Sequence, residues 1–270
     1  MLTTTNGRHP APAYVPGASE LEQTLQRLRR RFGPTAIGRL GIPAPPGAIS
    51  TGYPALDAAL GGGLPRGRII DIYGPEVSGK TTLCLNAIAQ TQKQGGVCVY
   101  IDTEHAFDPR HAVNCGVVLE DLYLAQPETA EQALEIAATL ARAGVAVVAI
   151  DSAAALLPRA EAETDLGDSH DGLQARLMSQ ALRKLVGPVR ANHTVFIFTN
   201  HLRQTAAGRE TSTGGLALRH YASVRLELRP QGPVRERNSV TGLRIRARVV
   251  KNRVAPPGRH CDFELLFGEV

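Results

Sequence analysis

Residues 74–81, with the sequence GPEVSGKT, are the segment whose residue types and spacing best suit chemistry. The glycines of such a loop let backbone N–H groups turn toward phosphate oxygens, and its lysine reaches the β- and γ-phosphates. A helix that begins at the lysine adds the positive end of its dipole, and the hydroxyl that follows is a ligand for Mg²⁺. We therefore predict a site for ATP and Mg²⁺ formed by Gly74, Pro75, Glu76, Val77, Ser78, Gly79, Lys80, Thr81 and Thr82.

Three other apolar runs of the chain also end in polar residues that suit phosphate chemistry. One leads to Glu104, another to Asp151 and a third to His201. An aspartate placed like Asp151 holds Mg²⁺, and a carboxylate placed like Glu104 orients or deprotonates the attacking water. The plain alternatives are an aspartate that caps a turn and a surface carboxylate.

These side chains need elements that bring them together, and the sequence predicts an α/β fold. Short apolar strands separated by helices are typical of a mostly parallel sheet with both faces covered. Ligands of such sheets bind outside the carboxyl ends of the strands, so Lys80, Glu104, Asp151 and His201 are expected to converge. The expected strands lie at 69–73, 97–101, 145–150 and 194–199, with helices from Lys80 to about 94, at 129–143 and at 173–186.

The last part of the chain has a different pattern. Apolar residues at 243, 245, 247 and 249 alternate with Arg244, Arg246 and Arg248, which predicts a half-exposed strand in an antiparallel extension. Residues 225–259 contain ten Arg and Lys residues against two Glu, and the whole chain has a net charge of +5. This excess suits a polyanionic partner, and a solvated strand face is an equal alternative.

The composition fits one large soluble domain with a small appendage, since 43% of the 270 residues are hydrophobic. No apolar run approaches the roughly 18 residues needed to span a bilayer, so no membrane partner is expected. Residues 1–17 lack the apolar core of a secretory signal. The four cysteines have no metal-ligand spacing, which favours reduced thiols in a cytoplasmic protein. They are Cys84, Cys98, Cys115 and Cys261.

The N-terminal region predicts a tail, a helix and a hinge. Residues 1–17 are expected to be disordered. Ser19 with Glu22 forms a capping box that opens a helix, and Gly33 stops it. The apolar stripe of this helix must be buried against the same subunit or a neighbour, because residues 43–47 look like a hinge. The stripe consists of Leu21, Leu25, Leu28 and Phe32.

Several further segments, together with the phosphate loop, resemble the bacterial RecA recombinases over about residues 19–270. They are IIDIYGPEVSGKTT at 69–82, IDTEHAFDP at 101–109, QPETAEQALEI at 126–136, GDSH at 167–170, KNR at 251–253 and the stretch 49–67 with DAALGGGL at 57–64. The resemblance implies a P-loop NTPase of RecA type in which residues 48–270 form the ATPase core. Residues 18–47 then form an arm that docks on the next subunit.

The resemblance also implies a function and a site. Family members are DNA-dependent ATPases that bind single-stranded DNA as helical filaments in recombination and repair, with ATP between adjacent subunits. Glu104 matches the catalytic glutamate, and Lys251 and Arg253 match two cations that reach the γ-phosphate of the neighbouring subunit. Asp108, His111 and Phe267 are expected to line the nucleotide site. The implied partners are single-stranded DNA and further copies of the chain, with double-stranded DNA as another candidate, and the implied location is the cytoplasm, at the nucleoid.

Two stretches match the DNA-binding loops of the family. The first, at about 161–172, precedes Arg176, Ser179 and Arg183, whose spacing places them on one helical face suited to phosphates. The second runs from His201 to about 216. Surface loops without a DNA contact are the alternative. The DNA-contacting residues expected there are Arg203, Thr211, Ser212, Gly214 and Gly215.

The sequence departs from the family pattern at several points. His201 stands where the family has a glutamine that senses the γ-phosphate, Asp171 replaces a methionine, and His111 replaces an aromatic residue that stacks on adenine. The second loop is shorter, and the sequence ends at Val270 without the family's C-terminal DNA-gathering domain. These changes leave open an accessory or regulatory paralogue that uses ATP as a switch. A small-molecule kinase is disfavoured, because no acceptor-binding lid is apparent.

Overall fold

The computed structural model describes residues 18–34, 36–38, 47–165, 172–204, 210–212, 215–236 and 239–267. It divides into two compact units, Met1–Pro45 and Pro46–Val270. The first contains α1 (Ala18–Phe32), which begins one residue before the expected cap and ends as expected. Its apolar stripe remains largely open, since Leu21 is 45% and Phe32 is 62% exposed. Docking of this stripe on a neighbour stays a prediction.

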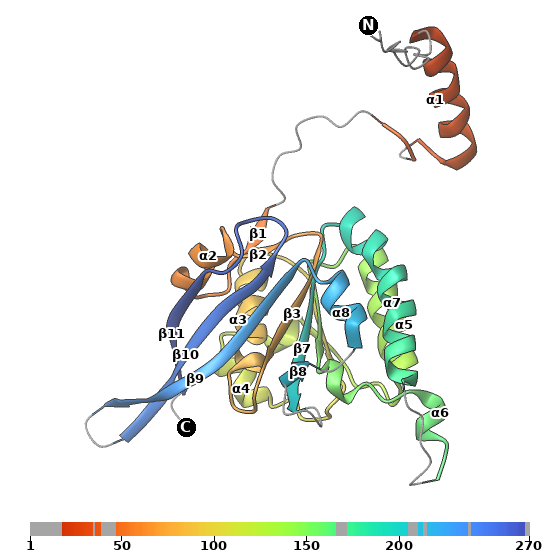
Figure 1. Cartoon of the computed structure of the whole chain (residues 1–270). Coiled ribbons are helices and arrows are strands. Elements are labelled where there is room, and N and C mark those ends of the chain that lie inside the picture. The colour runs from red at the N-terminus through yellow and green to blue at the C-terminus, as the bar shows by residue number, and fades with distance from the viewer. Residues whose placement is uncertain are drawn as a thin grey trace, which may run out of the picture. The chain divides into compact units, whose positions relative to one another are not determined.

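The second unit is built on a nine-stranded mixed sheet with the order β11-β10-β9-β3-β7-β6-β4-β5, in which β8 pairs with β7 (Figure 1). The strands are β3 (Arg68–Gly74), β4 (Cys98–Asp102), β5 (Leu122–Ala125), β6 (Val147–Asp151), β7 (Val195–Gln204), β8 (Glu210–Ser212), β9 (Val224–Glu236), β10 (Ser239–Asn252) and β11 (His260–Leu266), and a small separate sheet pairs β1 (Ala48–Ile49) with β2 (Leu64–Pro65). The helices are α2 (Pro54–Leu60), α3 (Lys80–Gln92), α4 (Pro109–Asn114), α5 (Ala130–Ala143), α6 (Arg159–Ala162), α7 (Leu173–Ala191) and α8 (Gly215–Tyr221).

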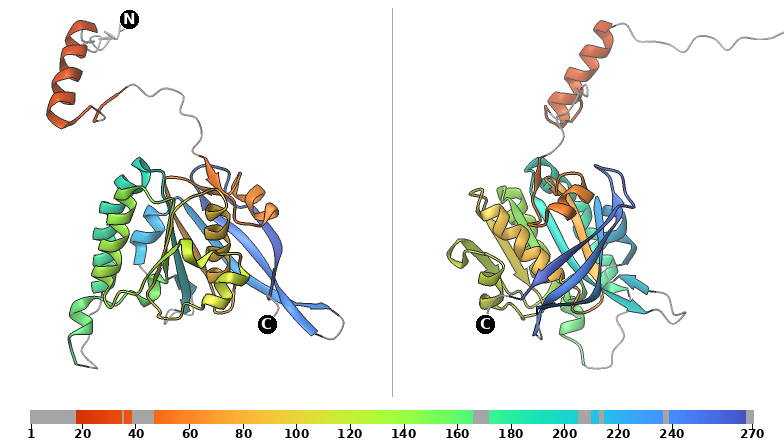
Figure 2. Two further views of the ribbon diagram at one scale, coloured as in Figure 1. Left: turned by 180° about the vertical axis from the view of Figure 1, so that it is seen from behind. Right: turned by 90° about the vertical axis from the view of Figure 1, so that its left-hand side faces the viewer.

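Both faces of the central strands are buried, as the uninterrupted apolar runs predict. In β7, for example, Val195 and Ile197 join the core beneath α3, whereas Phe196 and Phe198 join the core beneath α5 and α7. Successive side chains of a strand point to opposite faces, so a strand covered on both sides must be apolar throughout. Figure 2 shows the two helical layers from further directions. The neighbouring strands β3, β7, β6, β4 and β5 are parallel, and their carboxyl ends therefore lie at one edge of the sheet.

The antiparallel extension is confirmed in β9, β10 and β11. Ile245, Ala247 and Val249 are buried, while the arginines between them are exposed. The basic run is not a uniform basic surface, however, because acidic residues, most of them distant in sequence, lie beside many of its arginines. The ion pairs are Arg225–Asp71, Arg229–Glu227, Arg229–Glu210, Arg244–Glu264 and Arg246–Asp262.

Two elements are longer than expected. The sequence predicts that α7 ends at about residue 186, but the helix continues through Pro188 to Ala191. The third polar strand end was also misplaced: β7 continues past His201 to Gln204, because residues 202–204 pair antiparallel with β8. The polar residues resembled a strand end, and the partner strand that extends the pairing is not visible as a local pattern.

Two simple features of the described residues complete the fold. None of the helices found there is long and apolar enough to cross a membrane. The cysteines are free thiols, of which Cys84 and Cys98 are buried. Burial raises the pKa of the Cys98 thiol to about 12, so it stays protonated and packs as a small apolar group.

Replacing Arg225 with Leu is expected to lower the free energy of unfolding by about 3–5 kcal/mol, because it leaves the buried carboxylate of Asp71 without its partner. Arg225 Nε donates to Asp71 Oδ2 at 2.8 Å, and the two side chains are 12% and 0% exposed. The guanidinium also lies over the Tyr73 ring. Urea denaturation measures the loss. The control Arg246→Leu breaks an exposed pair with Asp262 and should leave the midpoint nearly unchanged; an equal loss in both variants would contradict the role of burial.

Candidate nucleotide site

The phosphate loop joins the end of β3 to the start of α3 as predicted. At two positions of this loop, neighbouring atoms approach the backbone so closely that only glycine fits. A Cβ on Gly74 would lie 2.4 Å from the Leu228 carbonyl oxygen, and a Cβ on Gly79 would lie 2.0 Å from Leu265 Cδ1. Gly79 also has a φ of +80°, a backbone conformation that residues other than glycine rarely adopt. The loop can therefore present its backbone N–H groups only with glycine at these positions.

Lys80 is held inside the loop rather than in solvent. Its Nζ donates to the Pro75 carbonyl oxygen at 2.7 Å, and the residue is 7% exposed. Burial lowers the pKa of Lys80, and the carboxylates of Asp151, Glu104 and Glu76 oppose this shift. The ammonium is thus a poorly solvated cation, which gains the most from a phosphate oxygen.

Asp151 and Thr81 form a preorganised pair of oxygen ligands at the end of β6. Thr81 Oγ1 donates to Asp151 Oδ2 at 2.6 Å, and Tyr100 donates its hydroxyl to the same oxygen at 2.6 Å. Thr199 donates to the other carboxylate oxygen. Burial, and then the Asp151 carboxylate, raises the pKa of Tyr100, so the phenol stays a donor. A hydroxyl and a carboxylate are ligands that fit Mg²⁺.

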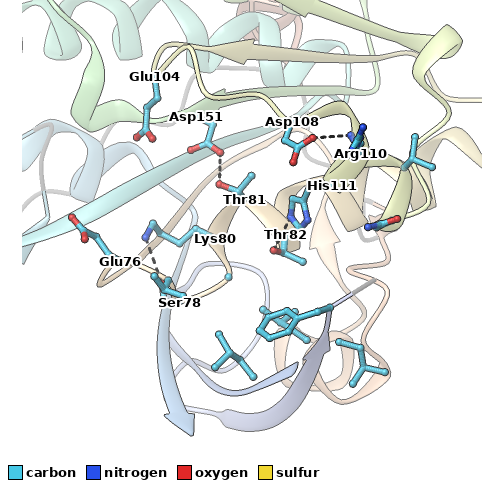
Figure 3. A pocket seen from close by; sticks show the side chains of 18 of the residues that line it. Glu76, Ser78, Lys80, Thr81, Thr82, Glu104, Asp108, Arg110, His111 and Asp151 are labelled. Atoms are coloured by element: carbon cyan, nitrogen blue, oxygen red, sulfur yellow. Dashed lines mark hydrogen bonds between the residues drawn. The ribbon is translucent and has the colours of Figure 1, made fainter. Parts of the chain in front are cut away.

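Glu104 lies just beyond the end of β4, on the same side of the sheet (Figure 3). Its Oε1 accepts a hydrogen bond from Ser152 Oγ and lies 3.0 Å from His201 Nε2. Ser152 is fully buried, whereas Glu104 and His201 are 36% and 29% exposed. The carboxylate is therefore fixed from two neighbouring strands while it remains open to the cavity.

One cavity of about 1010 Å³ contacts the phosphate loop and the residues expected around the base. His111 Nε2 lies 3.1 Å from Thr82 Oγ1, and Asp108 accepts from the backbone of Arg110 at the start of α4. Phe267 also lines the cavity. The volume is at the upper end of ligand pockets, which suits a nucleotide. All the residues predicted for the nucleotide and Mg²⁺, apart from Gly74 and Pro75, line this cavity.

Lys251 and Arg253 lie elsewhere. Among the described residues, the cavity wall includes neither of them. Lys251 Nζ donates to the carbonyl oxygens of Arg219 and His220 at 2.7 and 3.0 Å, and Arg253 Nη2 donates to that of His220 at 3.0 Å. Both cations thus cap the last turn of α8. Within one subunit, they do not meet the cavity.

The residues predicted to contact DNA divide into two groups. Arg176 and Arg183 are exposed on α7, with Ser179 half-buried between them. Arg203 is exposed on β7, and Gly215 begins α8. The other group bonds internally: Thr211 accepts from Arg219, and the buried Ser212 accepts from Arg225 Nη2 at 3.1 Å. Gly214, Asp171 and the motif at 167–170 lie outside the described residues.

Sequence reasoning missed three donors that hold the two acidic side chains: Tyr100, Thr199 and Ser152. Each contacts its carboxylate from a neighbouring strand or from the residue after it. Ser152 directly follows Asp151, and the pairing of β4 with β6 brings it to Glu104. The position directly after Asp151 was the one available signal for Ser152, and it points to Glu104 only once the strand order is known.

The comparisons with known proteins agree with this geometry. The family model for the RecA N-terminal domain matches residues 19–270. The protein named Protein RecA from Herpetosiphon aurantiacus is 55% identical over 260 residues, which cover 92% of this chain and 72% of that protein. Protein RecA from Rhodospirillum rubrum is 53% identical over 258 residues, which cover 92% of this chain and 70% of that protein.

Proposed function

The chain belongs to the RecA family, and on this premise we propose that it hydrolyses ATP on single-stranded DNA at a site shared by adjacent subunits. It is a DNA-dependent ATPase of recombination and DNA repair, as its similarity to the two RecA proteins supports. The observation that carries the proposal is the meeting of Lys80, Asp151 and Glu104 at one cavity, each delivered by a different strand end.

Each residue of the cavity has a role that its contacts suit. Lys80 exchanges the Pro75 carbonyl for the β- and γ-phosphates. Thr81 and Asp151 hold Mg²⁺, which neutralises charge that develops on the phosphates. Glu104 orients the attacking water and accepts its proton. His111 stacks on the base, with Asp108 and Phe267 around it.

The second half of the site comes from another copy of the chain. Lys251 and Arg253 cap α8 away from the cavity of their own subunit, and we assign them to the nucleotide of an adjacent subunit. Cations supplied in trans stabilise the charge of phosphoryl transfer. The open apolar stripe of α1 suits a contact that holds such copies together. Members of the RecA family in general assemble as filaments, which agrees with this division of the site.

The DNA contacts are proposed on the loop side of α7 and β7. Arg176 and Arg183 share an exposed helical face, and Arg203 lies on the strand that leads into the second loop. These guanidinium groups suit backbone phosphates, and double-stranded DNA is a further candidate ligand. We place the protein in the cytoplasm at the nucleoid. The regulatory alternative, with ATP as a switch only, is not favoured, because Glu104 is present and held by two side chains.

ATP hydrolysis measured with and without single-stranded DNA across a salt series tests the function. We expect DNA to stimulate turnover, and the apparent DNA affinity to fall linearly with the logarithm of salt concentration as counterions are released. Equal turnover with and without DNA at every salt concentration would exclude the proposal. Arg176→Gln should weaken DNA binding and reduce the salt slope, while Arg142→Gln on the exposed side of α5 serves as the matched control.

The kcat/KM for ATP is expected to decline as the pH rises through about 8, where Lys251 loses its charge in the ATP-free protein. Burial is the largest cause that lowers the pKa of Lys251 to about 8, followed by the charges of Arg253 and Arg225. A neutral amine cannot stabilise the γ-phosphate. Lys251→Arg keeps its charge at every accessible pH, so its kcat/KM should decline less above pH 8. Identical alkaline limbs in the two proteins would rule out Lys251 as the titrating group.

A further inference from the structure

His201, at which the sequence departs from the family pattern, forms a contact with Glu104. His201 Nε2 lies 3.0 Å from Glu104 Oε1, although 97 residues separate the two in sequence. Ser152 donates to the same oxygen from its buried position. Both donors thus meet one carboxylate oxygen, and they approach it from β7 and from the residue after β6. A glutamine at position 201 would be neutral at every pH, whereas an imidazole can take up a proton near physiological pH.

The contact lies among other charged side chains that line the cavity. The titratable groups that line the same cavity are Glu76, Lys80, Glu104, Asp108, Arg110, His111 and Asp151. The Glu104 carboxylate lies within hydrogen-bonding distance of the imidazole. A proton on His201 therefore acts directly on Glu104. The pair is about one-third exposed, so solvent protons reach it directly.

We propose that His201 is a proton-controlled positioning residue for Glu104. A protonated imidazole forms a charge-assisted hydrogen bond to the carboxylate, and such bonds are about twice as strong as neutral ones. The positive charge also lowers the proton affinity of the carboxylate, which makes Glu104 a weaker base. The neutral imidazole donates a weaker hydrogen bond and leaves Glu104 the stronger base toward the attacking water. This inference rests on the proposed function, since it assigns Glu104 as the base.

The proton on His201 takes no part in the chemical balance of hydrolysis. The water oxygen forms a bond to the γ-phosphorus while the bond from that atom to the β–γ bridging oxygen breaks. The water proton passes to Glu104, and the leaving ADP carries the electron pair. His201 changes only the readiness of Glu104 to accept the proton. The expected sign is therefore a turnover that falls in acid.

The first test compares kcat at saturating ATP and single-stranded DNA from about pH 5.5 to 8.5 in the wild type and in His201→Gln. The ratio of wild-type to variant kcat should fall by about fivefold or more from the neutral to the acidic part of this range. His260→Gln, an exposed substitution on β11, is the matched control and should retain the wild-type profile. A constant ratio, or a wild-type turnover that rises in acid relative to the variant, overturns the inference.

The second test follows the His201 imidazole by NMR. It therefore does not depend on the activity of a variant at position 201. Glu104→Gln removes the negative charge, and the His201 titration midpoint should then move to lower pH, because the carboxylate stabilises the imidazolium. An unchanged midpoint overturns the inference. Failure of the proposed function is separate: the wild type would then show no DNA-stimulated hydrolysis at any pH, whatever the imidazole does.

Discussion

Glu104→Gln is expected to reduce DNA-stimulated ATP turnover by about 10²- to 10⁴-fold, the range that a positioned general base contributes. The amide has nearly the same shape as the carboxylate, and its oxygen can still accept hydrogen bonds from Ser152 and His201. It cannot accept a proton from water. Nucleotide binding should persist, because Lys80, Thr81 and Asp151 are untouched. Steady-state hydrolysis and equilibrium binding of a fluorescent ATP analogue measure the two properties separately.

Glu135→Gln is the matched control for this substitution. Glu135 is exposed on α5, where it pairs weakly with Arg142. Its loss should change neither turnover nor binding. If Glu104→Gln hydrolyses ATP within a few-fold of the wild-type rate, another group is the base. If it loses nucleotide binding as well, Glu104 acts in the ground state and the assignment to the attacking water is wrong.

Lys251→Ala is expected to lower turnover by about 10³-fold or more, as the loss of a cation that acts in trans does. A mixture with Glu104→Gln should then recover activity. A complete site forms where the cavity of the first variant meets the cations of the second. In a random equal mixture with head-to-tail contacts, about a quarter of the junctions have this arrangement. Recovery to about a quarter of the wild-type rate is therefore the expected maximum.

Two controls define this experiment. Lys93→Ala removes an exposed lysine at the end of α3 and should leave turnover unchanged alone and in mixtures. Each parent variant assayed at the mixed concentration gives the background. No recovery above that background, from two variants that assemble together, would mean that each subunit hydrolyses ATP with its own residues. The proposed division of the site would then be wrong.

The sequence predicted the parts of the fold that depend on local pattern. The strands β3, β4, β6 and β7 are buried on both faces over their apolar runs, so each strand can be recognised in the sequence. Parallel pairing then placed Lys80, Glu104 and Asp151 at one edge. These predictions held because the carboxyl ends of parallel strands must lie together.

The parts that could not be predicted depend on which strands become neighbours. Ser152 reaches Glu104 only because β6 lies beside β4, and Tyr100 reaches Asp151 through the same pairing. The pattern of β10 suits a basic surface and a solvated strand face equally, and only the pairing with β11 shows that Glu264 and Asp262 lie opposite Arg244 and Arg246. Such cross-strand partners leave no local signal in the chain.

The capping of α8 by Lys251 and Arg253 has a consequence for any head-to-tail assembly. If these cations serve the next cavity, a row of subunits holds one fewer complete site than it has members. The subunit at one end keeps its ATP intact, because no neighbour brings the cations. At the other end, the two cations meet no ATP and keep their hydrogen bonds to α8. The row therefore has a chemical direction, because ATP persists at one end and not at the other. Exchange of subunits should be biased to one of the two ends.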